Sequence, residues 1–525
     1  MRRKSVPGRG FKYLPVELFR IGARHFAFDA SNVLFMEVDR PTFDILRLLR
    51  RENLSASELA VRLPQHAAKD LRNACRELAG LRKQGYLNPH KLVRAPQYSE
   101  QEVLSTLARK LSGLTVFLTT RCNLACSYCM YGSGYPQHRV PAGATMTRAT
   151  ADNMLDFLHR HSDEAERIQL VFYGGEPLLA FPLMRYSVDR WKAISGPKAG
   201  KTDFLLITNG TLLRGDRLDF LIRNRIHVQI SLDGDAVTHD MARRYRKNGR
   251  GSFEDIFSNL VALYARDPEY VRGFVHLKGV LTAGNAVTDD GSFYRHPVIA
   301  AIKQAGHLDR IEERPPVDPD RDAASPLPIR EIGKKLLRVR GARRLADLGA
   351  VLDEKERQIF EWTYANFYRV QAINKALFRR RFEVPFLRSC MPGFQDGAVL
   401  PNGDIAVCAE ATSHIIGNVN EGRWYDDRIA EMHFRLHSDW GPCSECFTGR
   451  FCNLCWQKVA GDGDAWRAGR TRFCVSRRKH FREIFGVMLR VLVRNPDLWE
   501  DLDRTVRETI AAIRKGLVSP SFPAQ

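Results

Sequence analysis

The strongest constraint on the fold is a regular alternation of strand-like and helix-like segments over residues 114–318. The chain repeats apolar, β-branched runs with helix-length stretches between them: LTVFLTT, IQLVFYG, FLLITNG, HVQISLDG and FVHLKGVLT, with a weaker sixth run near Ile311. Strands that are separated by helices pair in parallel, because each helix returns the chain to the same end of the sheet. We therefore expect an α/β domain over residues 110–318, and the spacing allows a partial barrel whose ligands lie at the carboxyl ends of the strands.

Three cysteines follow the first of these runs, where the chain leaves the predicted sheet. They are Cys122, Cys126 and Cys129, within eight residues. Three thiolates on one loop can hold one face of an iron–sulfur cube and leave its fourth iron open to a small molecule. A zinc knuckle is the alternative, but zinc usually takes four protein ligands, and His138 is nine residues beyond the third cysteine. The spacing therefore favours a cluster.

With the aromatic Tyr128 just before the third cysteine, this motif resembles that of the radical S-adenosylmethionine (SAM) superfamily. The resemblance implies that the open iron chelates the amino and carboxylate groups of SAM, and that one electron cleaves SAM to a 5′-deoxyadenosyl radical. Cys122, Cys126 and Cys129 would then be the catalytic cluster ligands.

Short polar motifs end the next three strand-like runs. Glycines let the backbone approach a ligand closely, a carboxylate accepts from an ammonium group, and arginine binds carboxylates in a bidentate manner. Any one of these motifs could be structural, but several in order at strand ends favour a ligand site. By the same resemblance we expect the SAM-binding residues to be Gly174, Gly175, Glu176 and Pro177 near the amino group, Asn209 near the ribose, and Ser231 and Arg243 near the carboxylate.

A second group of cysteines begins at residue 390. Its spacing resembles the seven-cysteine SPASM extension of peptide-modifying radical SAM enzymes, although two residues rather than the usual three separate the last two of the central four. The resemblance implies two auxiliary 4Fe–4S clusters, and so three clusters in all; a pair of zinc sites is the alternative. One cluster would be held by Cys443, Cys446, Cys452 and Cys474, and the other, one ligand short, by Cys390, Cys408 and Cys455.

The first 100 residues predict a small α+β unit. Two apolar runs in residues 24–39 flank a turn-like Ala-Ser-Asn segment, as in a hairpin, and three helical patterns follow, one of which opens on a capping box from Ser55 to Glu58. The unit resembles the PqqD-like winged-helix domain of peptide maturases, which implies a leader peptide that pairs with the hairpin edge. A winged helix that binds DNA is the alternative.

The remaining segments complete the predicted organisation. We expect a helical linker over 319–389, the SPASM domain over 390–480 and C-terminal helices over 481–525. No run of 18 uncharged apolar residues occurs, and the basic N-terminus lacks the apolar core of a secretory signal, so we expect a cytoplasmic protein with no membrane partner. The net charge of +21 fits either basic residues spread over solvated faces or attraction to an acidic partner; the arginine runs lack aromatic interleaving, and no nucleic-acid partner is expected.

The sequence therefore predicts an α/β fold. It has a partial (β/α)6 barrel of radical SAM type, an N-terminal winged-helix-like α+β domain and a C-terminal iron–sulfur SPASM domain. The implied function is that of a peptide-modifying oxidoreductase, a maturase reduced by a flavodoxin or ferredoxin. It would install a cross-link in a ribosomally made peptide or protein bound through the N-terminal domain; a thioether is favoured and a carbon–carbon bond is the second option.

Two alternatives to this function stay open. One is oxidation of a Cys or Ser side chain to formylglycine, as in sulfatase maturases, which place an Asp directly after the cysteine equivalent to Cys408. Ala409 stands there in this chain and Glu410 follows, which counts against that alternative. The other is an iron–sulfur redox sensor that binds nucleic acid.

Overall fold

The computed structural model describes residues 16–87, 91–93, 100–131, 143–281, 292–312, 383–385, 393, 397–437, 446–451 and 464–494, with single residues at 504, 507, 508 and 511. The predicted linker 319–389 lies outside the described residues except for 383–385. Four predicted cluster ligands also lie outside them: Cys390, Cys443, Cys452 and Cys455. Among the helices that are described, none is long and apolar enough to cross a membrane.

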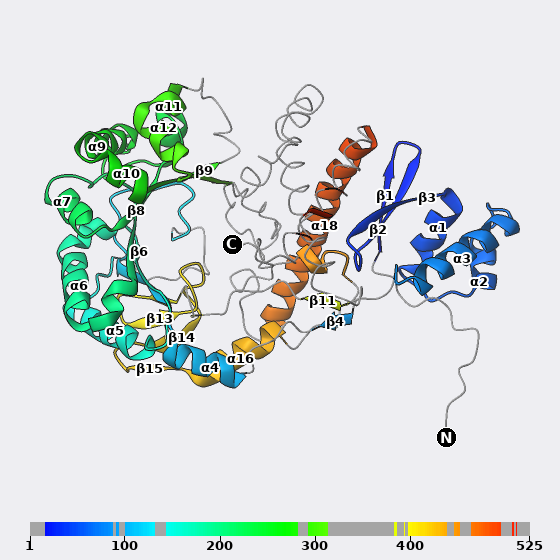
Figure 1. The fold of residues 1–525 in the computed structure, drawn as a ribbon, viewed down its shortest axis with the longest axis horizontal. Coiled ribbons are helices and arrows are strands. Elements are labelled where there is room, and N and C mark those ends of the chain that lie inside the picture. Colours follow the sequence, from blue (N-terminus) through cyan, green and yellow to red (C-terminus); the bar gives the residue numbers. More distant parts are fainter. Residues whose placement is uncertain are drawn as a thin grey trace.

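A parallel sheet lies inside the arc of helices on the left of Figure 1, and all six predicted strands are present. In sheet order from one edge, they are β10 (Leu308–Glu312), β9 (Val275–Leu281), β8 (His227–Ser231), β7 (Thr202–Thr208), β6 (Ile168–Gly174) and β5 (Gly113–Thr119). Each neighbouring pair is parallel, so the loops that follow the strands gather at one edge of the sheet. This edge is where the sequence motifs lie.

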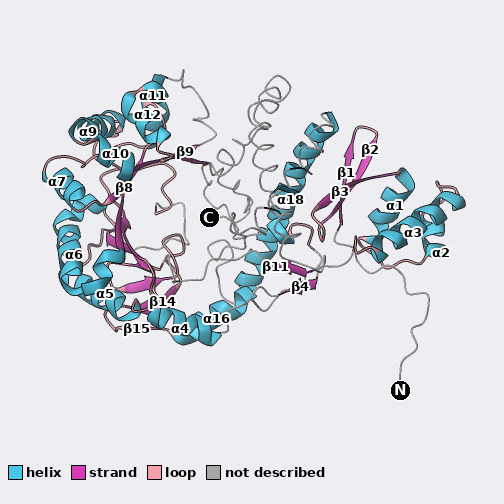
Figure 2. Cartoon of the chain, in the orientation of Figure 1, coloured by secondary structure: helices cyan, strands magenta, loops and turns pink. Residues whose placement is uncertain are grey.

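Helices cover the outer side of this sheet, and Figure 2 shows them as an arc around the strands. The main ones are α5 (Arg148–His161), α6 (Phe181–Ile194), α7 (Asp216–Arg223), α9 (Phe253–Arg266) and α12 (Pro297–Gln304). Alternate residues of a strand face opposite sides, and in β8 Val228 and Ile230 are buried under the helices. The intervening Gln229 and Ser231 are only partly buried, so the other face of the sheet is polar at this strand.

The sheet continues beyond β5 into the C-terminal cysteine-rich region, which the sequence did not predict. β12 (Ala398–Val399) pairs in parallel with β5, and β13 (Asp404–Ala406), β14 (Ile415–Asn418) and β15 (Arg423–Trp424) follow in antiparallel order. β5–β10 and β12–β15 thus form one mixed sheet of ten strands. Strands of two to four residues are too short to show a periodic pattern, which is why the sequence did not indicate them.

The N-terminal unit is a three-stranded antiparallel sheet with three helices. The predicted hairpin is present as β2 (Arg24–Asp29) and β3 (Leu34–Val38), and β1 (Val16–Ile21) adds a strand that was not predicted. α1 (Arg40–Leu49), α2 (Ala56–Arg62) and α3 (Ala68–Lys83) follow. The predicted capping box opens α2. One face of the small sheet packs on these helices through residues such as Ala27.

A long helix, α18 (Asp464–Arg494), lies against the other face of the small sheet, as Figure 1 shows beside β1. The ring of Phe485 is 4.8 Å from that of Phe28 and 5.6 Å from that of Phe35, centroid to centroid. Arg482 forms a 2.8 Å ion pair with the buried Glu17. The helix runs unbroken through residue 480, where we placed the start of the C-terminal helices.

Shorter elements complete the described structure. They are β4 (Lys91–Val93), paired with β11 (Glu383–Pro385), α4 (Glu100–Arg109), α8 (Ala236–Ala242), α10 (Pro268–Phe274), α11 (Ser292–Arg295), α16 (Asp426–His437), and the 3-10 turns η1 (Pro177–Ala180), η2 (Gly196–Lys201) and η5 (Gly449–Phe451).

Candidate functional site

The three cysteines of the first motif lie on the loop that follows β5. Cys122, Cys126 and Cys129 are free, partly buried thiols. The backbone N–H of Cys129 donates to the carbonyl of Cys126 at 3.1 Å, and the N–H of Leu124 donates to the Cys122 sulfur at 3.4 Å. These bonds fold the loop back on itself, so that residues 122–129 form a compact turn at the carboxyl edge of the sheet.

A segment after α8 supports this cysteine loop from outside. The N–H of Ala125 donates to the carbonyl of Arg244 at 2.8 Å, and the N–H of Arg246 donates to the carbonyl of Asn123 at 2.9 Å. The Arg246 side chain donates to the carbonyls of Cys122 and Leu124, both at 3.4 Å. Sequence reasoning missed Arg246, because nothing in its neighbourhood indicates that it reaches a loop more than a hundred residues earlier.

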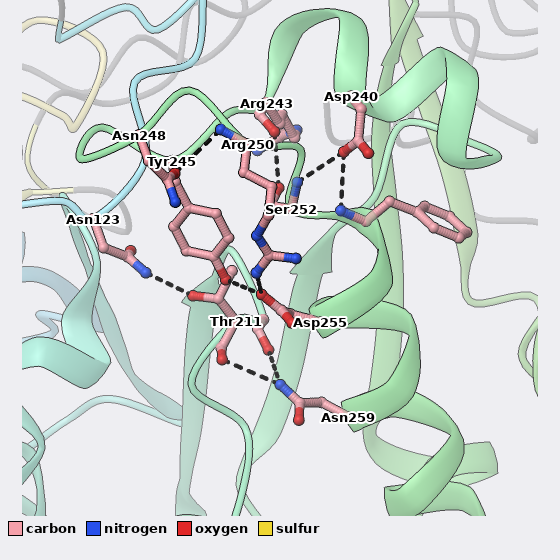
Figure 3. A network of polar contacts seen from close by, with 12 residues as sticks. Asn123, Thr211, Asp240, Arg243, Tyr245, Asn248, Arg250, Ser252, Asp255 and Asn259 are labelled. Atoms are coloured by element: carbon pink, nitrogen blue, oxygen red, sulfur yellow. Dashed lines mark hydrogen bonds and ion pairs between the residues drawn. The ribbon is translucent and has the colours of Figure 1, made fainter.

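The motif at the end of β7 contacts the same loop. The Asn209 amide donates to the Asn123 side-chain oxygen at 2.8 Å and approaches the Cys122 sulfur at 3.8 Å. The Asn123 amide in turn donates to the Thr211 hydroxyl at 2.8 Å, and Asn259 of α9 donates to the backbone of the Thr211 turn (Figure 3). Asn209, predicted near a ribose, thus contacts the cysteine loop directly.

The glycines of the second motif bring the end of β6 against the cysteine loop. A Cβ atom on Gly175 would lie 2.1 Å from the carbonyl oxygen of Arg121, which no side chain tolerates. Gly174 has a φ of +120°, a conformation that favours glycine. The N–H of Glu176 then donates to that same carbonyl at 2.8 Å. The sequence indicated close approach to a ligand; the structure shows close approach to the loop itself.

The carboxylate of Glu176 is fully buried and accepts three hydrogen bonds from the protein. The Thr208 hydroxyl and the Leu178 N–H donate to Oε1 at 2.8 and 3.0 Å, and the Asn209 N–H donates to Oε2 at 2.8 Å. Burial raises the pKa of this carboxyl to about 7, although the hydrogen bonds oppose the shift. Glu176 therefore ties the ends of β6 and β7 together, and Pro177 opens the turn η1 beside it.

A buried ion pair lies beside the cysteine loop, in contact with Tyr128. Arg243 donates from Nε to Asp233 Oδ2 at 3.0 Å, and the Tyr128 hydroxyl donates to the same oxygen. The N–H of Val280, near the end of β9, donates to Asp233 Oδ1 at 2.9 Å. The guanidinium also lies 5.2 Å from the centre of the Tyr128 ring. Asp233 thus joins the cysteine loop, the end of β8 and β9, a role that the sequence did not assign to it.

His239, on the helix that follows β8, bonds both Asp233 and Ser252 as a neutral ring. His239 is fully buried; its Nδ1 accepts from the Asp233 N–H at 3.3 Å, and its Nε2 is 3.0 Å from the Ser252 hydroxyl. That hydroxyl donates to the Arg243 carbonyl at 2.9 Å, so it accepts from Nε2–H. Burial, together with the charge of Arg243, lowers the pKa of His239 to about 4. The neutral ring is therefore the form that fits.

Ser231 differs from the other predicted SAM contacts. It ends β8 and is half-buried, and its hydroxyl makes no hydrogen bond with any residue that the structure describes. The Arg243 guanidinium uses Nε for Asp233 and has further N–H donors. A hydroxyl and a guanidinium can bind a carboxylate group, which is the role that we expected of these two residues.

The electrostatic setting of the thiols suits metal ligands. Burial raises the pKa of Cys122 to about 12, and it raises the pKa of Cys126, which the nearby Arg243 lowers in part. Such thiols become thiolates when a metal cation binds, because the cation replaces the lost solvation. Within the described residues, no three His, Cys, Asp or Glu side chains are arranged around a single metal ion. The three thiols fit a cluster by their number, their partial exposure and their place on one loop.

Three of the predicted auxiliary ligands are described. Cys408 follows β13 and Cys474 lies within α18, and both pack against the main core. Cys446 lies beside Thr448, with 3.2 Å between sulfur and hydroxyl. The Tyr131 hydroxyl, just beyond the first cysteine motif, donates to the carbonyl of Ala409 at 2.9 Å. The structure thus brings the Cys408 turn against the first cysteine loop.

Comparison with known proteins matches this part of the chain to the model of a superfamily. Residues 116–278, from β5 to β9, match the model of the radical SAM superfamily. The chain carries a radical SAM domain. The motifs at the ends of β5, β6, β7 and β8 all fall within that domain, and so does Arg243, which follows α8.

Relatives of the radical SAM domain include two enzymes whose names describe different reactions. A cysteine-type anaerobic sulfatase-maturating enzyme of Clostridium novyi is 30% identical over 167 residues, which are 31% of this chain and 42% of that enzyme. The radical SAM cyclopropyl synthase TigE of Paramaledivibacter caminithermalis is 23% identical over 162 residues, 29% of this chain and 33% of the synthase. The matched stretches thus span less than half of either relative. A solved structure of anSMEcpe with bound AdoMet aligns at 18% identity and a TM-score of 0.45, over 75% of this chain and 98% of that one.

Proposed function

We propose that this chain is a radical SAM enzyme that modifies a peptide or protein substrate. The observation that carries the proposal is the convergence of four strand ends on the cysteine loop. Asn209 reaches the Cys122 sulfur, and Tyr128 and Arg243 share the buried Asp233 beside the cysteine loop. A loop held so firmly at the carboxyl edge of a parallel sheet is where a cofactor is expected to react.

Each residue of the site has a role in this proposal. Cys122, Cys126 and Cys129 would hold a 4Fe–4S cluster, and Ser231 and Arg243 would bind the carboxylate of SAM. When bound, the cluster and SAM would supply the one-electron reductive cleavage of SAM. The chain's own residues fix the loop, orient SAM and keep water from the site, and the buried Asp233 holds Arg243 in place.

Two kinds of product are supported to a similar degree. Relatives that mature sulfatases favour oxidation of a Cys or Ser side chain to formylglycine, and the cyclopropyl synthase favours ring or cross-link formation in a peptide. We place the cross-link first, with a thioether ahead of a carbon–carbon bond. The reason is the position after Cys408, where Ala409 uses its carbonyl to accept from Tyr131 and has no acidic side chain. The two auxiliary clusters, three clusters in all, belong to this proposal.

The N-terminal unit is proposed to recognise the substrate. Its β3 is an edge strand of the small sheet, and an extended peptide can add to such an edge through backbone hydrogen bonds. Arg24 and Glu37 are paired at 2.6 Å across β2 and β3 and add an exposed contact to that hairpin. A winged helix that binds DNA uses a helix instead, so substitutions in β3 distinguish the two. A cytoplasmic location and a protein reductant complete the proposal.

The first experiment tests SAM chemistry. Protein reconstituted with iron and sulfide under anaerobic conditions is given SAM and dithionite, and 5′-deoxyadenosine is measured. We expect cleavage by the wild type and none after Cys122→Ala, with a loss of about four irons. Cys75→Ala is the matched control, because Cys75 is a half-buried thiol of α3 in the N-terminal unit. A wild-type protein that binds iron but never cleaves SAM would instead support a redox sensor.

The second experiment decides the product. The precursor peptide encoded beside the gene is incubated with enzyme and SAM and analysed by mass spectrometry. A cross-link removes two hydrogens and gives no reaction with hydrazides. Formylglycine reacts with hydrazides and, when it forms from cysteine, loses the sulfur. A hydrazide-reactive product would overturn the cross-link in favour of the sulfatase-maturase chemistry.

A further inference from the structure

The cysteine loop carries an exposed group of basic residues on its outer side. Four of them lie in the turn after α8, which folds back through a bridge between Arg244 and Gly251. The other two precede Cys122 and α7. We refer to this group as the basic rim; its members are Arg121, Arg214, Arg244, Arg246, Lys247 and Arg250, all exposed.

The rim is continuous with the cysteine loop. Arg246 donates to two carbonyls of the loop, and Arg121 is joined to Cys122 by a peptide bond. Figure 3 shows the turn packed through Tyr245, whose hydroxyl donates to Asp255 at 2.6 Å while Arg250 pairs with the same carboxylate. The pKa of Asp255 is lowered by these two bonds and also by the charge of Arg214, which places Arg214 beside the turn.

The charge of the rim is largely uncompensated. Four acids lie near the six cations: Asp240, Glu254 and Asp255, and Asp216, which follows Arg214 by two residues. Asp240 is engaged by the backbone N–H groups of residues 252 and 253, and Asp255 is engaged by Arg250. Arg121, Arg214 and Lys247 form no ion pair with any residue in the described part of the chain. Exposed cations without internal partners are available to an external one.

Apolar side chains adjoin the rim. Val237 and Met241 lie one turn apart on α8, and 65% and 52% of their surfaces are exposed. Residue 241 is separated from Arg243 by a single residue. Arginine and methionine are enriched in protein interfaces, and transient electron-transfer interfaces are small and steered by charge. Cations around a small apolar patch therefore fit a protein partner better than they fit a small anion.

We propose that the basic rim and Met241 form the docking surface for an acidic one-electron donor protein of the flavodoxin or ferredoxin type. The donor would be oxidised by one electron and the cluster on the neighbouring cysteine loop reduced by one, with no atom transferred. The inference rests on the proposed function, which requires such an electron at this loop. Its location follows from Arg246, which places the rim one hydrogen bond from the backbone of the first cysteine.

The test reverses two charges of the rim that support no part of the loop. The variant that combines Arg214→Glu with Lys247→Glu is compared with a control, Lys192→Glu. Lys192 is an exposed lysine in the last turn of α6 that bonds Asn224 and is not part of the basic rim. The affinity of a purified flavodoxin for the reconstituted protein is measured by titration calorimetry at several salt concentrations. We expect the double variant to bind on the order of tenfold more weakly and with a smaller salt dependence, and the control to bind as the wild type does.

A second readout separates docking from chemistry. SAM cleavage driven by reduced flavodoxin should need more flavodoxin for half-maximal rate in the double variant, whereas cleavage driven by dithionite should be unchanged. Unchanged flavodoxin affinity, or equal loss of dithionite-driven cleavage, would overturn the docking surface. A loss of duplex-DNA binding in the double variant, with flavodoxin binding intact, would also overturn it and assign the rim to nucleic acid. If the wild type cleaves no SAM with either reductant, the proposed function fails, and the calorimetry still decides the surface.

Discussion

Replacement of Phe485 by alanine should separate the N-terminal unit from the rest of the chain. Phe485 is 1% exposed, and its ring lies 4.8 Å from Phe28, 5.3 Å from Phe451 and 5.6 Å from Phe35. Truncation of a buried Phe to Ala costs about 3–5 kcal/mol, which is a large part of the 5–15 kcal/mol that a domain has available. The cavity would open between the small sheet and α18. The lost free energy is therefore that of the contact between these two elements.

The measurement is urea denaturation followed by circular dichroism. We expect Phe485→Ala to unfold in two steps, with the first step about 3–5 kcal/mol easier than in the wild type. The matched control is Val475→Ala on the same helix, because Val475 is 58% exposed and its loss should change stability by no more than about 0.5 kcal/mol. A destabilisation below about 1 kcal/mol for Phe485→Ala would refute the interpretation that this aromatic contact holds the unit.

The same contact links the N-terminal unit to a predicted cluster ligand. Cys474 precedes Phe485 by eleven residues on α18, about 17 Å along the helix. Deletion of the N-terminal unit would expose Phe485 to water and loosen the helix that carries Cys474. For this reason, a test of substrate recognition should substitute residues in β3 rather than delete the unit, and iron content should be measured alongside turnover.

Three further predictions concern the site. Asp233→Ala leaves the charge of Arg243 buried without its partner and should lower the free energy of unfolding by about 3–5 kcal/mol in urea titrations; a loss under 1 kcal/mol would contradict the buried ion pair. His239 has a folded pKa of about 4 against an ordinary 6.5, so the unfolded chain binds more protons between these values. Its contribution is therefore complete above pH 6.5 and falls by up to about 3 kcal/mol towards pH 4, a slope that His239→Gln should remove. Gly175→Ala forces the cysteine loop to move and should reduce bound iron, whereas Gly273→Ala, where a Cβ meets nothing within 4 Å, should not.

The sequence predicted the strands of the central sheet because each has an apolar face that the helices bury. Val228 and Ile230 alternate with Gln229 and Ser231 in β8, and that alternation is visible in the letters alone. The sheet extension through β12–β15 was not predictable in this way. Its strands are short, and the first of them, β12, pairs with β5, nearly three hundred residues earlier, so nothing local indicates that partner.

The same distinction applies to the site: the sequence indicates which types of residue lie there, but not which residues they contact. The cysteine spacing and the strand-end motifs could be read from the sequence, since each lies within a few residues. Asp233 and Arg246 could not, because their roles depend on Tyr128 and on the loop carbonyls, which only the fold brings near. The sequence shows Asp233 in the Ser-Leu-Asp-Gly motif, but it does not show that this carboxylate is buried. Sequence motifs thus identify the residues at a site, and distant contacts decide which of them bind a ligand and which hold the others.

That distinction changes how substitutions at the predicted SAM contacts should be interpreted. Glu176 and Asn209 are bonded to each other and to the cysteine loop, and Arg243 is bonded to Asp233, so a substitution at any of these would disturb the cluster loop as well as SAM. Ser231 has no such bond within the described residues, and its replacement by alanine removes only the hydroxyl. Ser231→Ala should therefore weaken SAM binding, by about 0.5–1.5 kcal/mol for one hydrogen bond, with full iron content and unchanged stability. Equal SAM affinity for the two proteins in equilibrium dialysis would show that the carboxylate is bound elsewhere.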